Sequence, residues 1–316
     1  MLISAYSYVS VNHIITSKHI LYLKNRSNYI EQNKQVLKYK ESSDSWIILN
    51  EIENVIKNKI LNVGTPLKSW GITINRGVLT GLNEAFIIDE DTKNKLVEED
   101  PKSAEIIRPI LRGRDIEKYS YRFANLYLIN VHNGIKEKGI EPVNIDNYPA
   151  IKEHLDKFLD KLKKRQDKGI TCYNLRNCAY MEDFFEQKII YPETTQNANF
   201  YLDSKGFFAD KTCFIMKTDK AKYLLATLSS SLFEYAYKKI FSSIELGISG
   251  YQYNKHALVN LPILLPNKEQ ETIINNLVDK ILSCNINDRS NIQNEININI
   301  AKLYGIDEKT RKKIRD

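Results

Sequence analysis

The sequence predicts an α+β fold, in which a mixed β-sheet with flanking helices is followed by a C-terminal helical segment. Short strand-like pieces separated by turn residues lie between residues 71 and 217, and an amphipathic helical run covers residues 149–168. Two helical apolar periods follow Glu269. We expect three parts, namely an N-terminal segment with a helix over residues 1–60, a sheet-containing domain over residues 61–265 and a helical segment over residues 266–316.

The first elements follow from apolar spacing and from the residues that interrupt it. Apolar residues keep helical spacing from Trp46 to Leu61, and Thr65-Pro66-Leu67 ends that helix. Residues 71–89 predict a strand, a tight turn bracketed by Gly77 and Gly81, and a second strand. Asp100-Pro101 predicts the start of a short helix that ends near Pro109, and residues 119–131 predict another strand.

The clearest helix is predicted from Pro149 to Lys168, with Gly169 placed to cap its C-terminus. Its apolar stripe consists of Ile151, Leu155, Phe158, Leu159 and Leu162. The opposite face carries four acidic residues and seven basic ones, namely Lys152, Lys157, Lys161, Lys163, Lys164, Arg165 and Lys168. A solvated helix face explains these charges as well as a phosphate-binding face does, so both interpretations stay open.

The second half of the chain predicts short strands first and helices later. Residues 188–193, 199–203 and 213–217 predict strands, and a helix is expected from about Asp219 to Phe241. A glycine-flanked loop with Tyr251-Gln252-Tyr253 precedes Leu261-Pro262-Ile263. The tail predicts two or three helices, with apolar periods at Ile273, Leu277, Ile281 and at Ile296, Ile300, Leu303.

Charge and aromatic content permit a polyanionic partner without requiring one. The 316 residues carry 46 Lys and Arg against 39 Asp and Glu, a formal charge of +7. Tyr occurs 19 times against two Trp, and its ring can stack on bases while its hydroxyl forms hydrogen bonds. An AT-rich genome, which raises Tyr, Ile, Asn and Lys together, explains the tyrosines equally well.

Cysteine usage and hydropathy predict a cytoplasmic protein with no membrane partner. Cys172, Cys178, Cys213 and Cys284 form no CxxC pair, and the five histidines are scattered, which argues against a zinc site or a disulfide framework. The N-terminus is a poor signal peptide, and no apolar run is long enough to span a bilayer.

Several catalytic motifs are missing, and we expect no cofactor. No glycine lies two positions from another, as in the G-x-G turn of dinucleotide and methyl-donor sites, and no proline follows an asparagine, as in the motif of amino-methyltransferases. Gly134 and Gly139 have phosphate-loop spacing, but Ile140 and Glu141 replace the residues that contact phosphate and magnesium. No G-x-S-x-G nucleophile elbow is present.

A metal-dependent endonuclease is the catalytic alternative. Glu186-Gln187-Lys188 fits half of the carboxylate and lysine pattern that such sites use. No Pro-Asp pair precedes it, and acidic-x-Lys triplets also occur at Asp91 and Asp203, so the pattern is not specific. We therefore expect a chain without catalytic residues of its own.

Several blocks in order resemble the TaqI-like C-terminal specificity domain of type IIG restriction-modification enzymes and adenine-specific DNA methyltransferases. Residues 72–89 read ITINRGVLTGLNEAFIID and residues 103–116 read SAEIIRPILRGRDI, close to two signatures of that family. Further blocks follow at Tyr148-Pro149, Lys188-Ile189-Ile190-Tyr191-Pro192, Leu261-Pro262-Ile263 and Leu303-Tyr304-Gly305-Ile306-Asp307. The resemblance covers roughly residues 46–316 and implies a DNA target-recognition domain over residues 61–265.

The resemblance also implies partners. Family members usually carry a methyltransferase domain, often with a nuclease, before this region, whereas here only some 45 residues precede it. We expect either a separate recognition subunit or a fragment of a longer enzyme, with double-stranded DNA and a DNA methyltransferase or endonuclease subunit as partners. The C-terminal helices are expected to be a spacer or docking surface for that subunit. A protein-only scaffold of a phage-defence complex is the other alternative.

The expected DNA contacts lie at glycine-flanked loops, where backbone can approach a duplex closely. Arg76, Arg112 and Arg114 can offer bidentate forks to guanine or phosphate, and Thr80 and Asn83 add short polar groups. Tyr251, Gln252, Tyr253 and Lys255 combine stacking, amide and cationic groups. Two alternatives stay open: Arg114 and Asp115 pair with partners that brace the fold, and the 251–255 loop is a plain surface turn.

Overall fold

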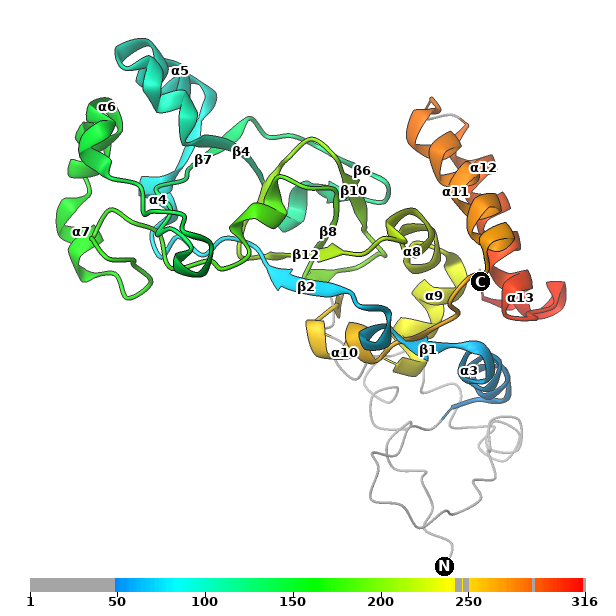
Figure 1. Cartoon of the computed structure of the whole chain (residues 1–316). Helices are drawn as coiled ribbons and strands as arrows, with labels where there is room; N and C mark the ends of the chain where they lie inside the picture. Colours follow the sequence, from blue (N-terminus) through cyan, green and yellow to red (C-terminus); the bar gives the residue numbers. More distant parts are fainter. Residues whose placement is uncertain (1–48, 242–245, 247–249, 286–287, 315–316) are drawn as a thin grey trace, which may run out of the picture. The chain divides into compact units, whose positions relative to one another are not determined.

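The computed structural model describes residues 49–241, 246, 250–285 and 288–314. Residues 51–316 form one compact unit, and the other unit, residues 1–50, contributes only Leu49 and Asn50 to the described part. The expected first helix is observed as α3 (Glu51–Val63), with Ile56 and Ile60 buried (Figure 1). The start of that prediction, Trp46 to Ile48, lies outside the described residues.

The first four-stranded sheet is antiparallel throughout, with the strand order β10-β8-β12-β2. Its strands are β2 (Thr73–Arg76), β8 (Lys188–Pro192), β10 (Tyr201–Asp203) and β12 (Cys213–Lys217). The predicted strands in the second half of the chain are thereby confirmed. Thr73 and Lys217 are cross-strand partners, so the chain enters and leaves this sheet at neighbouring positions.

The second four-stranded sheet mixes parallel and antiparallel pairs, with the strand order β11-β4-β7-β3. Its strands are β3 (Ile87–Asp89), β4 (Ile107–Leu111), β7 (Leu126–Ile129) and β11 (Phe208–Ala209). The parallel pair β11–β4 makes the sheet mixed, as predicted. The expected helix after Asp100 is the 3-10 turn η4 (Pro101–Glu105), and Asp100 accepts from Lys102 N as a cap. The prediction that this helix reaches Pro109 is wrong, because Pro109 lies inside β4 opposite Tyr127.

The expected strand-turn-strand unit over residues 71–89 is not a hairpin. Its first strand is β2 and its last is β3, and these belong to different sheets. Ala85 and Phe86, predicted as strand, lie in the short helix α4 (Asn83–Phe86) and are fully buried. Local apolar runs do not distinguish a buried strand from a buried helical turn.

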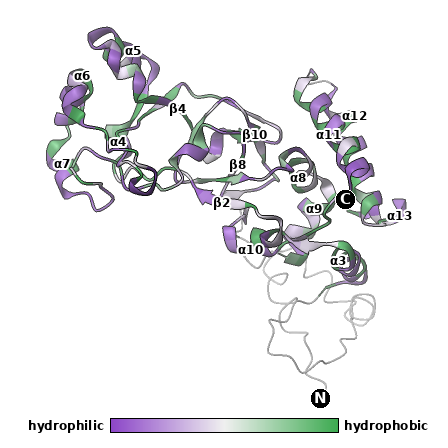
Figure 2. Ribbon diagram, viewed as in Figure 1, coloured by the Kyte–Doolittle hydropathy of each residue, from purple (hydrophilic) through white to green (hydrophobic). Residues whose placement is uncertain are grey.

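The predicted helix from Pro149 to Lys168 is two helices, α6 (Pro149–Asp156) and α7 (Leu159–Lys164). Ile151, Leu155 and Leu162 are fully buried, as the apolar stripe predicted. Gly169 does not cap a helix, because α7 ends five residues earlier. A further helix, α5 (Glu90–Glu99), begins at Asp89, whose side chain accepts from Thr92 N. Most of α5 is hydrophilic (Figure 2).

Helices dominate the last hundred residues. The expected helix from Asp219 to Phe241 is divided into α8 (Ala221–Leu228), α9 (Ser231–Ala236) and the π-helix η9 (Tyr237–Phe241), because Ser230 caps α9. Asn254 caps α10 (Lys255–Asn260). The tail, predicted as two or three helices, contains α11 (Lys268–Ser283), α12 (Arg289–Leu303) and α13 (Glu308–Lys313). In α11, Leu277 and Ile281 are buried as the apolar period predicted, but its first position is wrong: Ile273 is exposed and its neighbour Ile274 is buried.

Short paired strands and 3-10 turns complete the described elements. The pairs are β1 (Thr65–Pro66) with β14 (Pro262–Ile263), β9 (Thr194–Thr195) with β13 (Tyr251–Gln252), and β5 (Ile116–Glu117) with β6 (Ser120–Tyr121). The turns are η3 (Leu67–Trp70), η5 (Gly113–Asp115), η6 (Lys136–Lys138), η7 (Ile145–Asn147) and η8 (Met181–Phe184).

One hydrophobic core joins both sheets. Its buried residues run from Ala85 to Ile215 and include Phe86, Leu155 and Phe208. The helix α8 packs against β8 and β10, and α11 packs against α8 and α12 (Figure 1). None of the helices in the described part has the length and apolar character needed to cross a bilayer.

Candidate nucleic-acid interface

Arg76 is the last residue of β2, and its side chain is 44% exposed. Its Nη2 lies 2.6 Å from Glu193 Oε1, and its Nη1 donates to the Lys211 carbonyl at 3.2 Å. The guanidinium also lies 4.8 Å from the ring centroid of Phe214, its cross-strand partner. An exposed ion pair of this kind is stabilising by only about 0–1 kcal/mol, so a phosphate or a base edge can compete with Glu193 for Arg76.

The turn after Arg76 depends on close backbone contacts. Val78 N donates to the Ala209 carbonyl at 2.7 Å, and a Cβ on Gly77 would lie 1.9 Å from the Asp210 carbonyl oxygen. Only glycine fits there. Asn83 is exposed, as a contact residue must be. Thr80 is 1% exposed and its hydroxyl lies 2.5 Å from Asn83 Oδ1, so the prediction that Thr80 contacts DNA is corrected: it positions Asn83.

Arg165 holds this turn from inside the protein. It is 7% exposed, and its guanidinium donates to the carbonyls of Thr80, Cys172 and Asn174. The guanidinium also lies 4.5 Å from the ring centroid of Phe86. Burial lowers the pKa of Arg165 to about 10, so it stays charged at neutral pH. Arg165 was predicted on the basic face of a helix, either solvated or phosphate-binding, and its position in the interior corrects that prediction.

Arg112 and Arg114 have different environments, although both were predicted contacts. Arg112 forms a bidentate ion pair with the buried Asp115, with Nε–Oδ2 and Nη2–Oδ1 distances of 2.8 Å. The hydrogen bond to Asp115 raises the pKa of Arg112. Arg114 is exposed and has no ion-pair or hydrogen-bond partner among the described residues. Arg112 thus takes the bracing role that had been left open for Arg114.

The 251–255 segment is partly buried. Tyr251 and Gln252 form β13 and are half-buried, and Lys255 is exposed at the start of α10. Tyr253 is 2% exposed, and its ring stacks on Tyr237 with a centroid distance of 4.2 Å. The prediction that Tyr253 contacts DNA is corrected, because its ring is part of the core.

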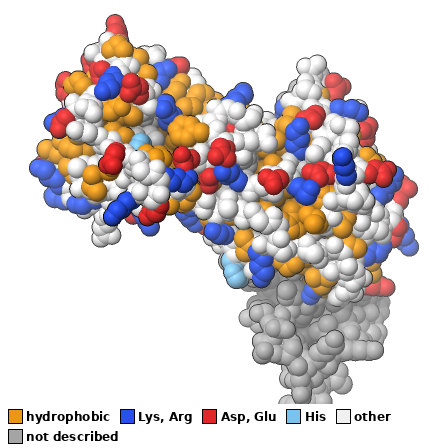
Figure 3. Space-filling view, viewed as in Figure 1, with side chains coloured by type: hydrophobic (Ala, Val, Ile, Leu, Met, Phe, Trp, Pro, Cys, Tyr) orange, Lys and Arg blue, Asp and Glu red, His pale blue; other side chains and the backbone are white. Residues whose placement is uncertain are grey.

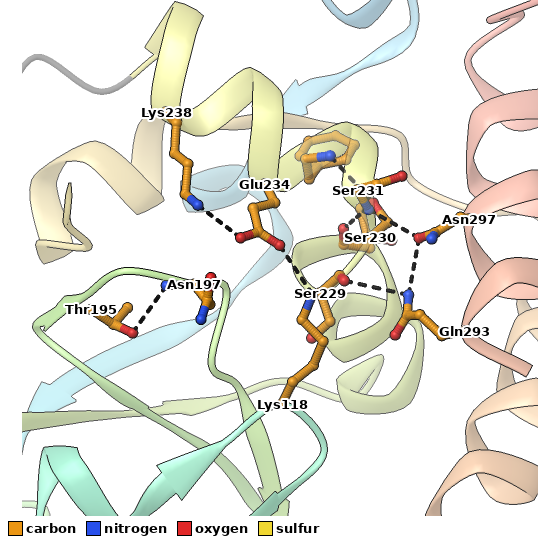
Figure 4. A network of polar contacts seen from close by, with 12 residues as sticks. Lys118, Thr195, Asn197, Ser229, Ser230, Ser231, Glu234, Lys238, Gln293 and Asn297 are labelled. Carbon is orange, nitrogen blue, oxygen red and sulfur yellow. Dashed lines mark hydrogen bonds and ion pairs between the residues drawn. The ribbon is translucent and has the colours of Figure 1, made fainter. Parts of the chain in front are cut away.

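Beside Tyr251, an ion-pair network joins the β5–β6 turn to α9 (Figure 4). Glu234 accepts from Lys118 at 3.0 Å and from Lys238 at 2.8 Å, and the Lys238 ammonium lies 5.3 Å from the Tyr251 ring centroid. Burial acts to raise the pKa of Glu234, but the two lysines outweigh it and the pKa is lowered. Further along, Asn297 Oδ1 accepts from Ser231 N and Gln293 Nε2, both at 2.9 Å.

The segments around Arg76, Gly113 and Tyr253, which were predicted to contact DNA, meet through contacts with Glu193 and Thr212. Glu193 N donates to the Thr212 carbonyl, Tyr253 N to the Glu193 carbonyl, and Gly113 N to Thr212 Oγ1, at 2.7–2.8 Å. Arg76 reaches the same junction through Glu193 and Lys211. Sequence reasoning missed Glu193 and Lys211, although the Asp210-Lys211-Thr212 turn between two strands was a usable signal. Arg114 follows Gly113 and Lys211 precedes Thr212 in the chain, and we call Arg76, Arg114 and Lys211 the cationic junction.

Comparison with known proteins agrees with this architecture. The model of the TaqI-like C-terminal specificity domain matches residues 108–263. Residues 108–263 are therefore similar to a TaqI-like C-terminal specificity domain. Its fold is similar to that of the Type IIL restriction-modification enzyme MmeI, solved in complex with DNA, with a TM-score of 0.56 and 13% identity over 77% of this chain and 35% of that one. The type IIG restriction endonuclease BpuSI matches with a TM-score of 0.45 and 14% identity over 81% of this chain and 33% of that one.

The chain therefore spans about a third of the length of the MmeI chain. The residues matched by the family model include Arg112, Arg114, Lys211 and the 251–255 segment. Arg76, Thr80 and Asn83 precede the matched residues but are joined to them through β12 and Arg165. The boundaries at residues 61 and 266 stay predictions.

The basic residues of the 149–168 region have several roles. Lys152 pairs with Asp146 at 2.5 Å and Lys161 with Glu84 at 2.8 Å, as in an ordinary solvated face. Lys168 donates to the Lys163 carbonyl at 2.8 Å. Lys157, Lys163 and Lys164 are exposed, and their ammonium groups have no partner within the described ranges. On the visible face of the molecule, basic side chains are interspersed with acidic ones (Figure 3).

Lys188, the lysine of the endonuclease alternative, has a structural role. Its side chain is fully buried, and Nζ lies 2.6 Å from Asp203 Oδ2, which is also fully buried. Burial lowers its pKa, an effect that Asp203 partly offsets. The Glu186 carboxylate points instead to Lys217, at 2.7 Å. A buried, paired lysine cannot assist a water at Glu186, so this geometry gives the endonuclease alternative no support.

Proposed function

We propose that the chain recognises a specific sequence in double-stranded DNA for a restriction-modification enzyme. The match to a TaqI-like specificity domain over residues 108–263 carries this proposal. The fold similarity to MmeI, which was solved in complex with DNA, supports it.

The cationic junction supplies the two kinds of contact that such recognition needs. Phosphate contacts set the register of a protein on the duplex, and base-edge contacts set the sequence. Arg114 is exposed and unpaired within the described part, so its guanidinium is free to form a bidentate contact with guanine. On binding, Arg76 leaves its ion pair with Glu193 and donates to an acceptor on the DNA. Lys211 and Lys255 contact phosphate. Asn83 and Gln252 offer amides to adenine.

The reaction itself belongs to another polypeptide or to another part of a longer one. We propose that an adenine-specific DNA methyltransferase or an endonuclease uses this chain to find its site. The C-terminal helices α11 to α13 form its docking surface, and the complex works in the cytoplasm, where bacterial DNA lies.

Selection from a pool of randomised duplexes tests the proposal. The full chain should enrich one sequence, and its affinity should fall with salt along a log-log slope of roughly −0.9 for each phosphate neutralised. The same titration with Arg114→Ala should show reduced preference for the enriched sequence. A chain that enriches nothing and binds duplex without salt dependence would instead be the protein-only scaffold.

A further inference from the structure

Ile170 is exposed to an unusual degree. It is 70% exposed, more than any other large hydrophobic residue in the described ranges, where the next is Leu265 at 53%. It lies in residues 165–176, which follow α7 and which we call the wedge loop. Single surface hydrophobics are common, so the exposure alone decides nothing. The contacts that hold Ile170 in place single it out.

The backbone on either side of Ile170 is anchored. Ile170 N donates to Asn133 Oδ1 at 2.7 Å, and Gly169 N donates to the Asn174 carbonyl at 3.0 Å. Asn174 is 1% exposed and donates in turn to the carbonyls of His132 and Val143. A Cβ on Gly169 would lie 2.2 Å from Asn133 Oδ1, so glycine is needed for the loop to approach this closely.

Arg165 links the wedge loop to the proposed DNA-contacting turn. Its guanidinium binds carbonyls of Cys172 and Asn174 within the loop and the carbonyl of Thr80 in the turn. The Cα of Gly81 also approaches the loop, since a Cβ there would lie 3.0 Å from Asp167 Cβ. The apolar tip and the turn that carries Asn83 are therefore held together by one buried cation.

Basic residues precede and follow Ile170 along the chain. Lys163 and Lys164 end α7 just before the loop, and Lys168 lies two residues before Ile170. Arg176 closes the loop and is 61% exposed, with Asp167 at 3.4 Å. An exposed apolar residue in a basic stretch of chain does not match an apolar protein surface, but it matches a duplex, whose phosphates flank a stack of apolar base faces.

We propose that Ile170 is a wedge that inserts between two stacked base pairs of the bound duplex, while Lys163, Lys164 and Lys168 hold the flanking phosphates. This inference rests on the proposed function. Apolar side chains such as Ile open base steps in this way and kink the duplex. A wedge must be rigid, because a mobile loop would fold back instead of separating the bases, and the anchors at Asn133, Asn174 and Arg165 supply that rigidity. The opened step should be a pyrimidine–purine step, which unstacks most easily.

The test uses the full chain and the best duplex from the selection, with 2-aminopurine replacing each adenine in turn. Its fluorescence rises when stacking is lost, so one position should brighten on binding of the wild type. Ile170→Ser should abolish that rise and weaken binding about tenfold, because unstacking has lost its compensating contact. Its salt slope should not change, since no charge is lost. Ile170→Leu should keep the signal.

Two further variants serve as controls. Ile273→Ser removes an exposed isoleucine from α11 (45% exposed) and should change neither fluorescence nor affinity. Lys164→Ala should reduce the salt slope while the 2-aminopurine signal at saturating protein persists.

The wedge is overturned if Ile170→Ser brightens 2-aminopurine as the wild type does, or if no position brightens with a wild type that binds its selected duplex tightly. In both cases the proposed DNA recognition stands. If the wild type selects no sequence, the proposed function fails and the wedge fails with it.

Discussion

Arg112 and Arg114 stand two residues apart in the same glycine-flanked block, yet the fold gives them opposite roles. Arg112 points at Asp115, which is 5% exposed, and forms two 2.8 Å contacts with it. Arg114 points away from described partners into solvent. A residue that braces a buried carboxylate affects stability, whereas an exposed cation affects what the surface binds.

Arg112→Ala should therefore lower the free energy of unfolding by about 3 kcal/mol, because the buried Asp115 carboxylate loses its partner. Urea denaturation of the variant and the wild type measures this change. An unfolding free energy equal to that of the wild type would show that the ion pair does not brace the loop.

Arg114→Ala should leave the melting temperature unchanged and cost about 1–3 kcal/mol of affinity for the selected duplex, the range of one bidentate base contact. Fluorescence anisotropy with the selected duplex and a scrambled one measures it. An equal loss on both duplexes would make Arg114 a phosphate contact and not a base reader.

At the scale of elements, the network around Glu234 ties the β5–β6 turn to α9. Lys118 comes from the turn, Lys238 from the π-helix after α9, and both reach one carboxylate that is 19% exposed (Figure 4). Because the folded-state pKa of Glu234 is lowered, the ionised form is favoured by folding. The stabilisation it gives is present above the pKa of an unfolded Glu, about 4.3, and is lost as the pH falls through the folded-state pKa.

Glu234→Gln should therefore lower the melting temperature at pH 7, and the difference from the wild type should shrink below pH 4, where the wild-type carboxylate is also neutral. Thermal unfolding followed by circular dichroism between pH 3 and pH 7 gives both differences. A pH-independent difference would mean that charge at this position is not what joins the two elements.

Elements with a clear local period could be predicted from the sequence, and those decided by distant contacts could not. The strand from Cys213 to Lys217 was predicted at its observed bounds, because a short apolar run between polar turns has few alternatives. The helix break after Asp156 was missed, since the apolar stripe continues in register across both helices. The separation of β2 from β3 depends on the pairing of β2 with β12, about 140 residues later.

The same distinction applies to the candidate site. The glycines beside arginines were expected to let the backbone approach a duplex, whereas Gly77 is needed for close packing against the backbone of Asp210. Burial of Thr80, Tyr253 and Arg165 could not be predicted, because each of these residues is common on surfaces and its environment comes from segments far away in the chain. Glu193 was missed for the same reason: its relation to Arg76 exists only across the folded sheet.

At the scale of the whole described unit, the chain passes from the N-terminal helix α3 into the two four-stranded sheets and back out to the helices α8 to α13 at one strand pair, and the β9–β13 pair and the Lys118–Glu234 ion pair join the two parts further. The core from Ala85 to Ile215 belongs to the sheets, and the chain reaches it through Thr73 in β2 and leaves it through Lys217 in β12. These two residues are cross-strand partners.

Replacing residues 74–216 with the equivalent segment of another TaqI-like specificity domain should change the selected DNA sequence and leave the helices folded. The replacement must keep Lys118, which pairs with Glu234, and the strand faces that α8 covers. Duplex selection and circular dichroism of the chimera measure the two properties. A chimera that folds but selects the original sequence would place recognition outside residues 74–216.

The pairing of Thr73 with Lys217 has an evolutionary consequence. Residues 74–216 begin and end at this one strand pair. Two recombination events in the gene, one in each of these strands, would therefore transfer all of these residues together. The incoming residues must still form the contacts that join this segment to the helices, namely the β9–β13 pair and the Lys118–Glu234 ion pair. Under the proposed function, one such exchange would give a lineage a new DNA target while the proposed docking surface of α11 to α13 is inherited unchanged.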